Sequence, residues 1–318
     1  MSRLNDEIKA MNFQHPEFIP VTVGLLPATW KKHREKLNDL CARHPLLFDQ
    51  AAIAKSDYDD IRGTYVRGDH VDAWGCVWSN IKDGMEAMVK EHPLPTRETI
   101  RTLKAPAEDI GTPHGFMYLR LADLRGFENL MIDFAEEPPE LQMLIDIVCD
   151  YNVRQINLRL QKEKPANRIM GFGDDLGTQI GLAISPALWR KYLKPCFMKL
   201  YALVHNAGYS VYMHTDGRII DIIPDLIECG VNVLNPQVRA NGIDDLARVC
   251  KGKVCLNLDL DRQMFPFASP RQIDDHIRDV VEKLGSREGG LWLIAEIADD
   301  VPLENVEARA HSQFVAIN

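Results

Sequence analysis

The chain has 318 residues, 46% of them hydrophobic and 26% charged, so it can bury a large core and is not expected to be disordered. Its formal net charge of −9 argues against nucleic acid as a main partner. No apolar run reaches the roughly 18 residues that a membrane-spanning helix needs, and the first residues lack a signal-peptide pattern. The seven cysteines include no Cys-x-x-Cys pair, which favours reduced, buried cysteines in a cytoplasmic protein.

The first half of the chain is predicted to be irregular. Its expected elements are a strand over residues 18–24, a helix over 28–41, an edge hairpin within 57–77, a loop with a short helix over 93–104, a helical region around Gly126 over 119–134, and a long helix over 138–162. No repeat, low-complexity tract or flexible linker interrupts the chain. One domain spanning residues 1–318, with insertions in its N-terminal half, therefore fits better than two domains.

The second half alternates regularly between strands and helices. Strands are expected over residues 168–172, 209–213, 231–234, 254–258 and 292–295, and helices over 185–207, 219–229, 243–250, 269–284 and from 303. Ser-Pro pairs at 185–186 and 269–270 open the helices over 185–207 and 269–284, and Gly208 and Gly230 end those over 185–207 and 219–229. Strands that alternate with helices in this way indicate parallel pairing and an α/β fold.

The most informative stretch is residues 211–217, in which an apolar strand leads to His214, Asp216 and Gly217. Residues i and i+2 of a strand point to the same face, so His214 and Asp216 are expected to project together. Enzymes built from repeated βα units place their chemistry at this carboxyl end of the strands. A structural histidine followed by an Asx turn is the alternative interpretation.

Further polar residues follow other predicted strands. Glu296 ends the apolar run 291–295, and burying such a carboxylate is costly without a partner, which favours a role in a site. The other candidates at strand ends are Asp174, Asp175, Gln179, Asn235, Gln237, Asn257, Asp259 and Asp261. Trp74 and Tyr65 are candidates for an aromatic pocket wall, although aromatic residues at these spacings are more often part of a core.

Several common enzyme motifs do not occur in the sequence. It has no Gly-x-Ser-x-Gly elbow, no phosphate-binding Gly-x-x-x-x-Gly-Lys loop and no Gly-x-Gly-x-x-Gly fingerprint. The classes of serine hydrolase, P-loop nucleotidase and Rossmann dehydrogenase therefore lack their usual signals.

With this layout, the chain resembles the uroporphyrinogen decarboxylase superfamily, which also contains zinc-dependent methyltransferases that exchange methyl groups with corrinoid proteins. The resemblance is strongest in residues 175–186 (DLGTQIGLAISP), 208–217 (GYSVYMHTDG), 225–237 (DLIECGVNVLNPQ) and 302–305 (PLEN). It implies a single (β/α)8 TIM barrel with its active site in the C-terminal mouth of the barrel.

Within the superfamily, the methyltransferase-like members are the better match. Uroporphyrinogen decarboxylases carry an arginine-rich N-terminal segment that binds substrate carboxylates, whereas residues 18–24 contain no arginine. A porphyrinogen with its many carboxylates needs several cations. Residues 72–78 (DAWGCVW) are instead similar to the D-x-W-G-x-x-W stretch of methyltransferase-like members.

The resemblance also implies a metal site. In methyltransferase-like members, zinc is bound by His-x-Cys in the middle of the barrel and by a cysteine near the C-terminus. His214, Asp216 and Glu296 occupy these places here, so they are the predicted metal ligands and catalytic residues. Zinc accepts histidine and carboxylate ligands, and an oxygen-rich set suits activation of an oxygen rather than a sulfur.

The sequence therefore predicts a methyltransferase that moves a methyl group from a small methylated or methoxylated compound to a corrinoid. The corrinoid is expected on a separate partner protein, because the chain lacks the Asp-x-His-x-x-Gly motif that binds cobalamin. The residues expected to bind substrate are Asp174, Asp175, Gln179, Asn235, Gln237, Asp259, Trp74 and Tyr65. Two alternatives stay open: a metal-independent uroporphyrinogen decarboxylase, and a metal-free barrel that binds a small molecule.

Overall fold

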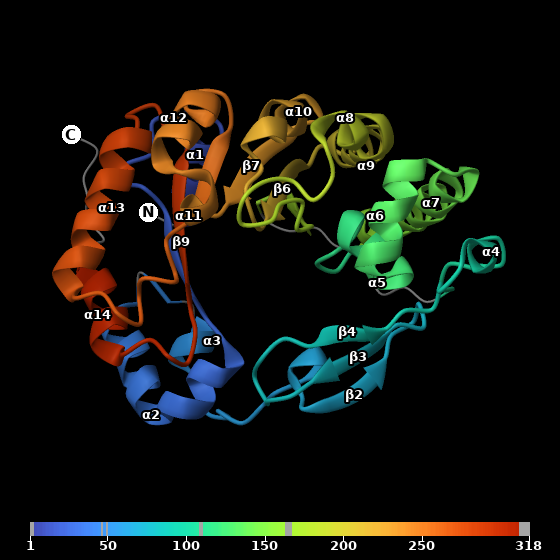
Figure 1. Ribbon diagram of the computed structural model, residues 1–318. Helices are drawn as coiled ribbons and strands as arrows, with labels where there is room; N and C mark the ends of the chain where they lie inside the picture. The colour runs from blue at the N-terminus through green and yellow to red at the C-terminus, as the bar shows by residue number, and fades with distance from the viewer. Residues whose placement is uncertain (1–2, 46, 49, 108–110, 163–166, 312–318) are drawn as a thin grey trace. The chain divides into compact units, whose positions relative to one another are not determined.

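The structure, a computed structural model, describes residues 3–45, 47–48, 50–107, 111–162 and 167–311 (Figure 1). It comprises two compact units. Unit 1 consists of Met1–Gly68, Asn80–Ala87 and Gln237–Asn318, and unit 2 of Asp69–Ser79 and Met88–Pro236.

Unit 1 is built on three parallel strands in the order β1-β9-β8, with register pairs such as Val21–Leu293 and Leu258–Leu293. The strands are β1 (Val21–Leu25), β8 (Cys255–Asp259) and β9 (Leu291–Ile297). The helices are α1 (Arg3–Met11), α2 (Pro27–Arg43), α3 (Gln50–Ile53), α11 (Val238–Asn241), α12 (Ile243–Cys250), α13 (Pro270–Leu284) and α14 (Leu303–His311), with a 3-10 turn at Gly63–Tyr65. All of β8 is buried, as expected of a strand covered on both faces.

Helix α13 shows how the sequence fixes an element of this unit. Ser269 caps its first turn, Pro270 occupies the first helical position, and Gln272 completes a capping box. Ile273, Ile277, Val280 and Leu284 are the buried residues of the helix, at the spacing of one helical face. Helix α14 packs beside α13 (Figure 1).

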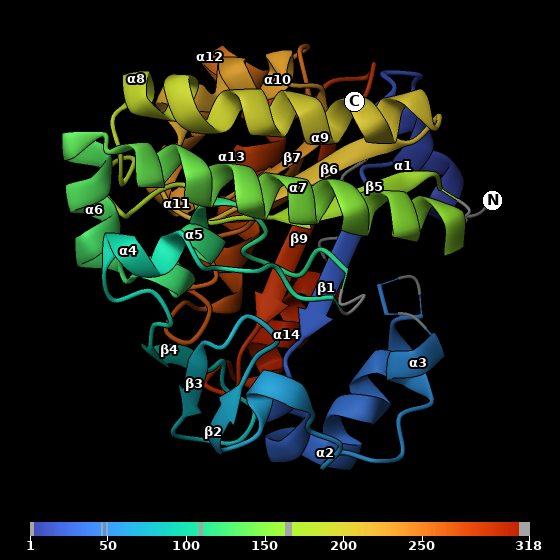
Figure 2. The ribbon, with the colours of Figure 1, turned by 90° about the vertical axis from the view of Figure 1, so that its right-hand side faces the viewer.

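Unit 2 is built on three parallel strands in the order β7-β6-β5. These are β5 (Ile169–Gly173), β6 (Ser210–Thr215) and β7 (Val231–Pro236). The helices are α4 (Arg97–Ile100), α5 (Tyr118–Arg125), α6 (Phe127–Glu136), α7 (Pro139–Lys162), α8 (Pro186–Leu188), α9 (Lys194–Asn206) and α10 (Ile223–Glu228), with a π-helical turn at Trp189–Leu193 and a 3-10 turn at Ile220–Ile222. The long helices α7 and α9 lie side by side (Figure 2).

The register of this sheet determines which residues meet at its carboxyl edge. His214 of β6 pairs with Gly173 of β5 on one side and with Asn235 of β7 on the other. The side chains at and just after these three positions are therefore neighbours.

A separate small sheet follows the order β2-β3-β4, in which β3 and β4 are antiparallel. Its strands are β2 (Gly68–Val71), β3 (Val77–Asn80) and β4 (Met88–Glu91). The predicted edge hairpin within residues 57–77 thus has three strands and extends further along the chain.

The predicted α/β class with parallel strands is confirmed, but a closed eight-stranded barrel is not. The part of the chain that the structure describes has six parallel strands of this kind, three in each unit. Helix α1 was not predicted from the sequence. A single domain over residues 1–318 stays a prediction. Among the described helices, none is long and apolar enough to cross a membrane.

Candidate functional site

Two histidines and one aspartate gather at the carboxyl edge of the sheet in unit 2. His114 lies in the loop before α5, Asp175 follows β5, and His214 lies in β6. One ligand atom of each lies within 4.8 Å of those of the other two. His114 Nε2 is 3.1 Å from Asp175 Oδ1, and the two imidazole rings lie 5.4 Å apart between centroids. We call these three residues the His-Asp-His cluster.

Neighbouring side chains orient His214. Its Nδ1 lies 2.7 Å from Asn235 Oδ1, and since an amide oxygen only accepts, the Nδ1–H of His214 donates this bond. The other ring nitrogen, Nε2, lies 3.3 Å from Asp216 Oδ1. The structure therefore brings together four of the predicted residues, His214, Asp216, Asn235 and Asp175, and adds His114.

The carboxylates change the protonation of both histidines. The hydrogen bond to Asp175 raises the pKa of His114 above its ordinary value, against the effect of burial. Burial alone would lower the pKa of His214, but the hydrogen bond and charge of Asp216, with the bond to Asn235, outweigh it and raise the pKa. Burial acts to raise the pKa of Asp175, but the hydrogen bond and charge of His114, with the backbone N–H of Asp216 and the charge of His214, together outweigh it and lower the pKa.

A glycine makes room for the His114 ring. A Cβ atom on Gly173 would lie 2.5 Å from His114 Nδ1, well inside van der Waals contact. The backbone N–H of Gly115 also donates to the carbonyl of Gly173 over 2.8 Å. The end of β5 thus holds the loop that carries His114, and any side chain at position 173 would displace the His114 ring.

The two adjacent aspartates after β5 have different surroundings. Asp174 is fully buried, and its carboxylate accepts hydrogen bonds from the backbone N–H groups of Tyr118 and Leu119 at 2.5 and 2.8 Å. Burial raises its pKa to about 7, although these two bonds act in the opposite direction. Asp174 therefore anchors the first turn of α5, whereas Asp175 joins the His-Asp-His cluster. The predicted roles of Asp174 and Asp175 in binding substrate stay predictions.

A second polar group, in unit 1, contains Glu296. Arg262 Nη1 donates to Glu296 Oε2, and Arg262 Nε lies 3.7 Å from Asp259 Oδ2. Burial, followed by the charge and bond of Glu86 and the charge of Glu296, raises the pKa of Tyr65 to about 12. A cavity of about 320 Å³ is lined by Leu26, Arg262, Gln263, Pro266, Phe267, Glu296, Ala298 and Asp300.

Three predicted residues of unit 1 thus lie near one another: Glu296, Asp259 and Tyr65. Gln237 also belongs to this group, since it forms an isolated parallel bridge with Asp259. The predicted convergence of Glu296 with His214 joins residues of different units and stays a prediction.

Residues 72–78, the D-x-W-G-x-x-W stretch, are held in place by hydrogen bonds to Asp72. Asp72 accepts hydrogen bonds from the backbone N–H groups of Trp74 and Cys76, from Trp78 Nε1 and from Arg120 Nη1. Trp74 is buried, with its ring 4.8 Å from that of Tyr151. The stretch thus forms a loop organised around the carboxylate of Asp72, and contact of Trp74 with substrate stays a prediction.

Gln179 is exposed at a tight turn. Thr178 and Gly181 close this turn, in which the N–H of Thr178 donates to the carbonyl of Gly181 over 2.6 Å. The predicted contact of Gln179 with substrate stays a prediction.

Two residues of these groups were not predicted from the sequence. His114 does not follow a strand, so the pattern of polar residues at strand ends does not predict it; the only local signal is its place in Thr-Pro-His-Gly before a helix. Arg262 lies three residues after Asp259, beyond the end of β8, and a charged residue there is common on a solvated loop.

The sequence of this chain matches a known protein family over more than half of its length. The family described as Uroporphyrinogen decarboxylase (URO-D) matches residues 117–312. This chain belongs to the uroporphyrinogen decarboxylase family. The resemblance stated from the sequence motifs is therefore confirmed. The matched span includes Asp175 and His214, whereas His114 lies just before it.

A solved structure shares the fold of this family member at low sequence identity. A methyltransferase from Methanosarcina mazei is 18% identical, with a TM-score of 0.66, and the match covers 98% of each chain. At this identity the likeness shows the fold. A dihydropteroate synthase from Xanthomonas albilineans with 4-aminobenzoic acid is 16% identical over 52% of this chain and 59% of that one, with a TM-score of only 0.34. No curated protein matches the sequence.

The donor set of the His-Asp-His cluster fits the zinc that the resemblance implies. Zinc binds imidazole nitrogen and carboxylate oxygen, and catalytic zinc sites commonly use three protein ligands. A metal-binding histidine usually donates its other N–H to a fixed acceptor, as His214 does to Asn235.

Proposed function

We propose that this member of the uroporphyrinogen decarboxylase family transfers a methyl group from a small methylated or methoxylated compound to a corrinoid carried by a separate protein. The observation that carries the proposal is the His-Asp-His cluster, a metal-type donor set at the carboxyl edge of a parallel sheet. A decarboxylase of the uroporphyrinogen type needs no metal. The shared fold with a protein named as a methyltransferase supports the same choice.

The reaction breaks the bond between the methyl carbon and its oxygen, or another leaving atom, and forms a bond between carbon and cobalt(I). The leaving atom keeps the electron pair and takes up a proton. Zinc bound at the site would supply a Lewis acid that neutralises the charge developing on the leaving atom.

The chain's own residues would position the reactants. The bond from His214 to Asn235 fixes the imidazole, and the turn at residues 216–217 holds Asp216 beside it. In unit 2, Asn235 would orient the polar part of the substrate and Trp74 would cover its apolar part. The substrate contacts expected of Gln237, Asp259 and Tyr65, in unit 1, stay predictions. The methyl group would face outward, because a corrinoid held by a partner protein is too large to enter a barrel.

Two alternatives compete with this proposal. Uroporphyrinogen decarboxylation needs several cations for the substrate carboxylates. Residues 18–24 contain no arginine, and Arg262 is already paired with Glu296 and Asp259. In a metal-free binding protein, the His-Asp-His cluster would be only a polar network.

The test uses the full-length protein with reduced cobalamin as the methyl acceptor. Zinc-loaded protein is mixed with cobalt(I) cobalamin and, one at a time, with methanol, methylamines, methanethiol and methoxylated benzoates. The expected result is loss of the cobalt(I) absorption band and formation of methylcobalamin with at least one donor class. Turnover of uroporphyrinogen without methyl transfer would instead establish the decarboxylase.

Matched histidine variants show whether transfer depends on the cluster. His214→Ala should abolish transfer. His205→Ala, which changes an exposed histidine of α9 in the same unit, should retain the wild-type rate. Equal transfer rates for the two variants would contradict the proposed site. A wild-type protein that neither transfers a methyl group nor binds zinc would favour the metal-free alternative.

A further inference from the structure

We propose that the metal of this protein is bound by His114, Asp175 and His214, and that Glu296 is not a ligand. The ligand set would then differ from the one that the family resemblance implies, His214, Asp216 and Glu296, and it would lie entirely within unit 2. The inference concerns the site of the proposed function and rests on that function only for the reaction that the metal would serve.

The distances within the cluster are close to those of a zinc site. Tetrahedral zinc with bonds of about 2.0–2.1 Å places its ligand atoms about 3.3–3.4 Å apart. His114 Nε2 and Asp175 Oδ1 are 3.1 Å apart, and all three ligand atoms lie within 4.8 Å of one another. Small side-chain movements therefore suffice to bring these atoms around one ion.

The hydrogen bond from Nδ1 to Asn235 leaves Nε2 of His214 as the nitrogen that can bind a metal. Asp216 lies 3.3 Å from this Nε2 but is not one of the three residues whose ligand atoms lie mutually within 4.8 Å. Asp216 and Asn235 are thus positioning residues that hold the imidazole from two sides.

The surroundings of Glu296 are less suitable for a cation. The guanidinium of Arg262 donates directly to its carboxylate, and Asp259 lies near the same guanidinium. A zinc ion bound by Glu296 would lie close to a permanent positive charge, which opposes binding. The carboxylate of Asp175 has two imidazoles nearby instead, and these become neutral ligands when they lose their protons.

Gly173 provides a test that removes no donor atom. A Cβ atom at this position would lie 2.5 Å from His114 Nδ1, so Gly173→Ala displaces the His114 ring. Gly171 lies in the same strand, two residues earlier, and a Cβ atom there would have no neighbour within 4 Å. Gly171→Ala is therefore the matched control.

The experiment uses Zn2+ alone with the full-length protein. Each variant is stripped with a chelator, reloaded with Zn2+ and desalted, and its zinc content and affinity are measured by atomic emission and by competition with a zinc-binding dye. We expect about one zinc per chain in the wild type and in Glu296→Gln. His114→Ala and Asp175→Ala should bind zinc more than about 100-fold more weakly, and Gly173→Ala at least about tenfold more weakly, while Gly171→Ala matches the wild type.

Two results would overturn the inference: a wild type that binds no zinc, or zinc lost from Glu296→Gln but retained by His114→Ala. Circular dichroism checks that each variant is folded, and if His114→Ala does not fold, the Gly173→Ala and Gly171→Ala pair decides the question. The assay contains no methyl donor and no corrinoid. A failure of the proposed methyl transfer therefore leaves its outcome unchanged.

Discussion

Gly177 and Gly217 lie backbone against backbone: a Cβ atom on Gly217 would lie only 2.2 Å from the carbonyl carbon of Gly177. This contact joins the loop after β5 to the turn after β6. The N–H of Gly177 donates to the carbonyl of Asp216 over 3.2 Å, and that of Arg218 to the carbonyl of Thr178 over 2.7 Å. The two loops that carry Asp175 and Asp216 are thus held together.

Gly217→Ala should therefore destabilise the protein. Gly217 has a φ of +82°, where a side chain is strained, and the added methyl group would meet backbone that cannot move away. The free energy of unfolding should fall by at least about 2 kcal/mol. Gly181→Ala, in the loop after β5 that also contains Gly177, adds a Cβ with no neighbour within 4 Å and should change the free energy of unfolding by less than about 0.5 kcal/mol. Urea unfolding of both variants measures the difference, and equal stabilities would contradict the close packing.

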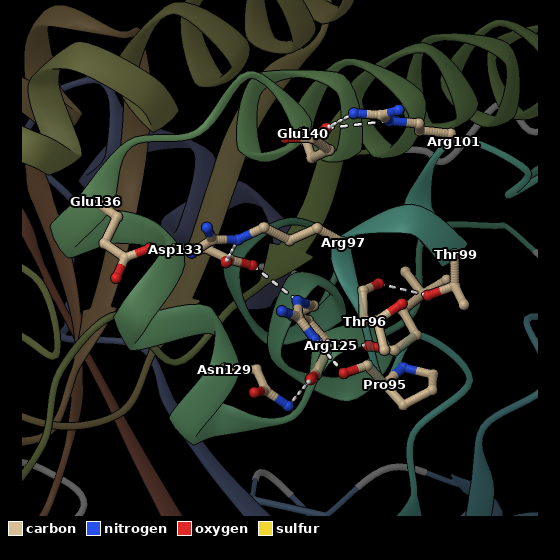
Figure 3. A network of polar contacts seen from close by, with 11 residues as sticks. Pro95, Thr96, Arg97, Thr99, Arg101, Arg125, Asn129, Asp133, Glu136 and Glu140 are labelled. Carbon is tan, nitrogen blue, oxygen red and sulfur yellow. Dashed lines mark hydrogen bonds and ion pairs between the residues drawn. The ribbon is translucent and has the colours of Figure 1, made fainter.

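A buried arginine network in unit 2 supports the next prediction (Figure 3). Asp133 accepts hydrogen bonds from Arg97 Nε and Arg125 Nε, each at 2.7 Å, and both Asp133 and Arg125 are buried. Asp133→Ala leaves the charge of Arg125 buried without this partner, so it should cost about 3–5 kcal/mol of stability. Glu136 pairs with Arg97 on the surface, and Glu136→Ala should cost less than about 1 kcal/mol. Urea unfolding tests the contrast; similar losses in the two variants would argue against it.

Asp123 should make stability depend on pH. Burial raises its pKa to about 6, although the charge of Arg120 acts to lower it, while the charge of Asp72 adds to the rise and those of His92 and His114 oppose it. A carboxyl group with a pKa near 4 in the unfolded chain and a higher one in the folded chain binds its proton more tightly when folded. Its contribution should therefore weaken stability as the pH rises from about 4 to 6 and stay constant above that.

Asp123→Asn removes this penalty. The difference in free energy of unfolding between the variant and the wild type should shift in favour of the variant by up to about 3 kcal/mol when the pH rises from 4 to 8. Urea unfolding at both pH values measures this gain. A difference between variant and wild type that does not change with pH would show that Asp123 titrates normally.

The strand-end rule explains what the sequence could predict of the site. His214, Asp216 and Asn235 come directly from the order of strands in the chain, and parallel register places His214 beside Asn235. Helix α13 begins and ends where its Ser-Pro start and apolar spacing predict. These features depend on local sequence, which is why they could be predicted.

The remaining features depend on contacts between distant segments. His114 reaches the cluster because its loop hydrogen-bonds to Gly173, about sixty residues later, and no local pattern indicates this. The pairing of Arg262 with Glu296 likewise joins the ends of two different strands. The six parallel strands expected from the sequence are present, but the eight-stranded barrel that the resemblance implies is not confirmed, and segments of the irregular first half form the small β2-β3-β4 sheet.

The last prediction concerns the rival activity. We expect no conversion of uroporphyrinogen to coproporphyrinogen, because that substrate presents many carboxylates and each needs a cation or several N–H donors. Residues 18–24 supply no arginine, and Arg262 already has two carboxylate partners, Glu296 and Asp259. The net charge of −9 adds a general repulsion of polyanions. Anaerobic incubation with uroporphyrinogen, followed by chromatography of the oxidised products, provides the measurement, with a known uroporphyrinogen decarboxylase as the positive control. Coproporphyrin formed at a rate comparable to that control would show that cations elsewhere in the chain bind the substrate, and it would replace methyl transfer with decarboxylation as the function.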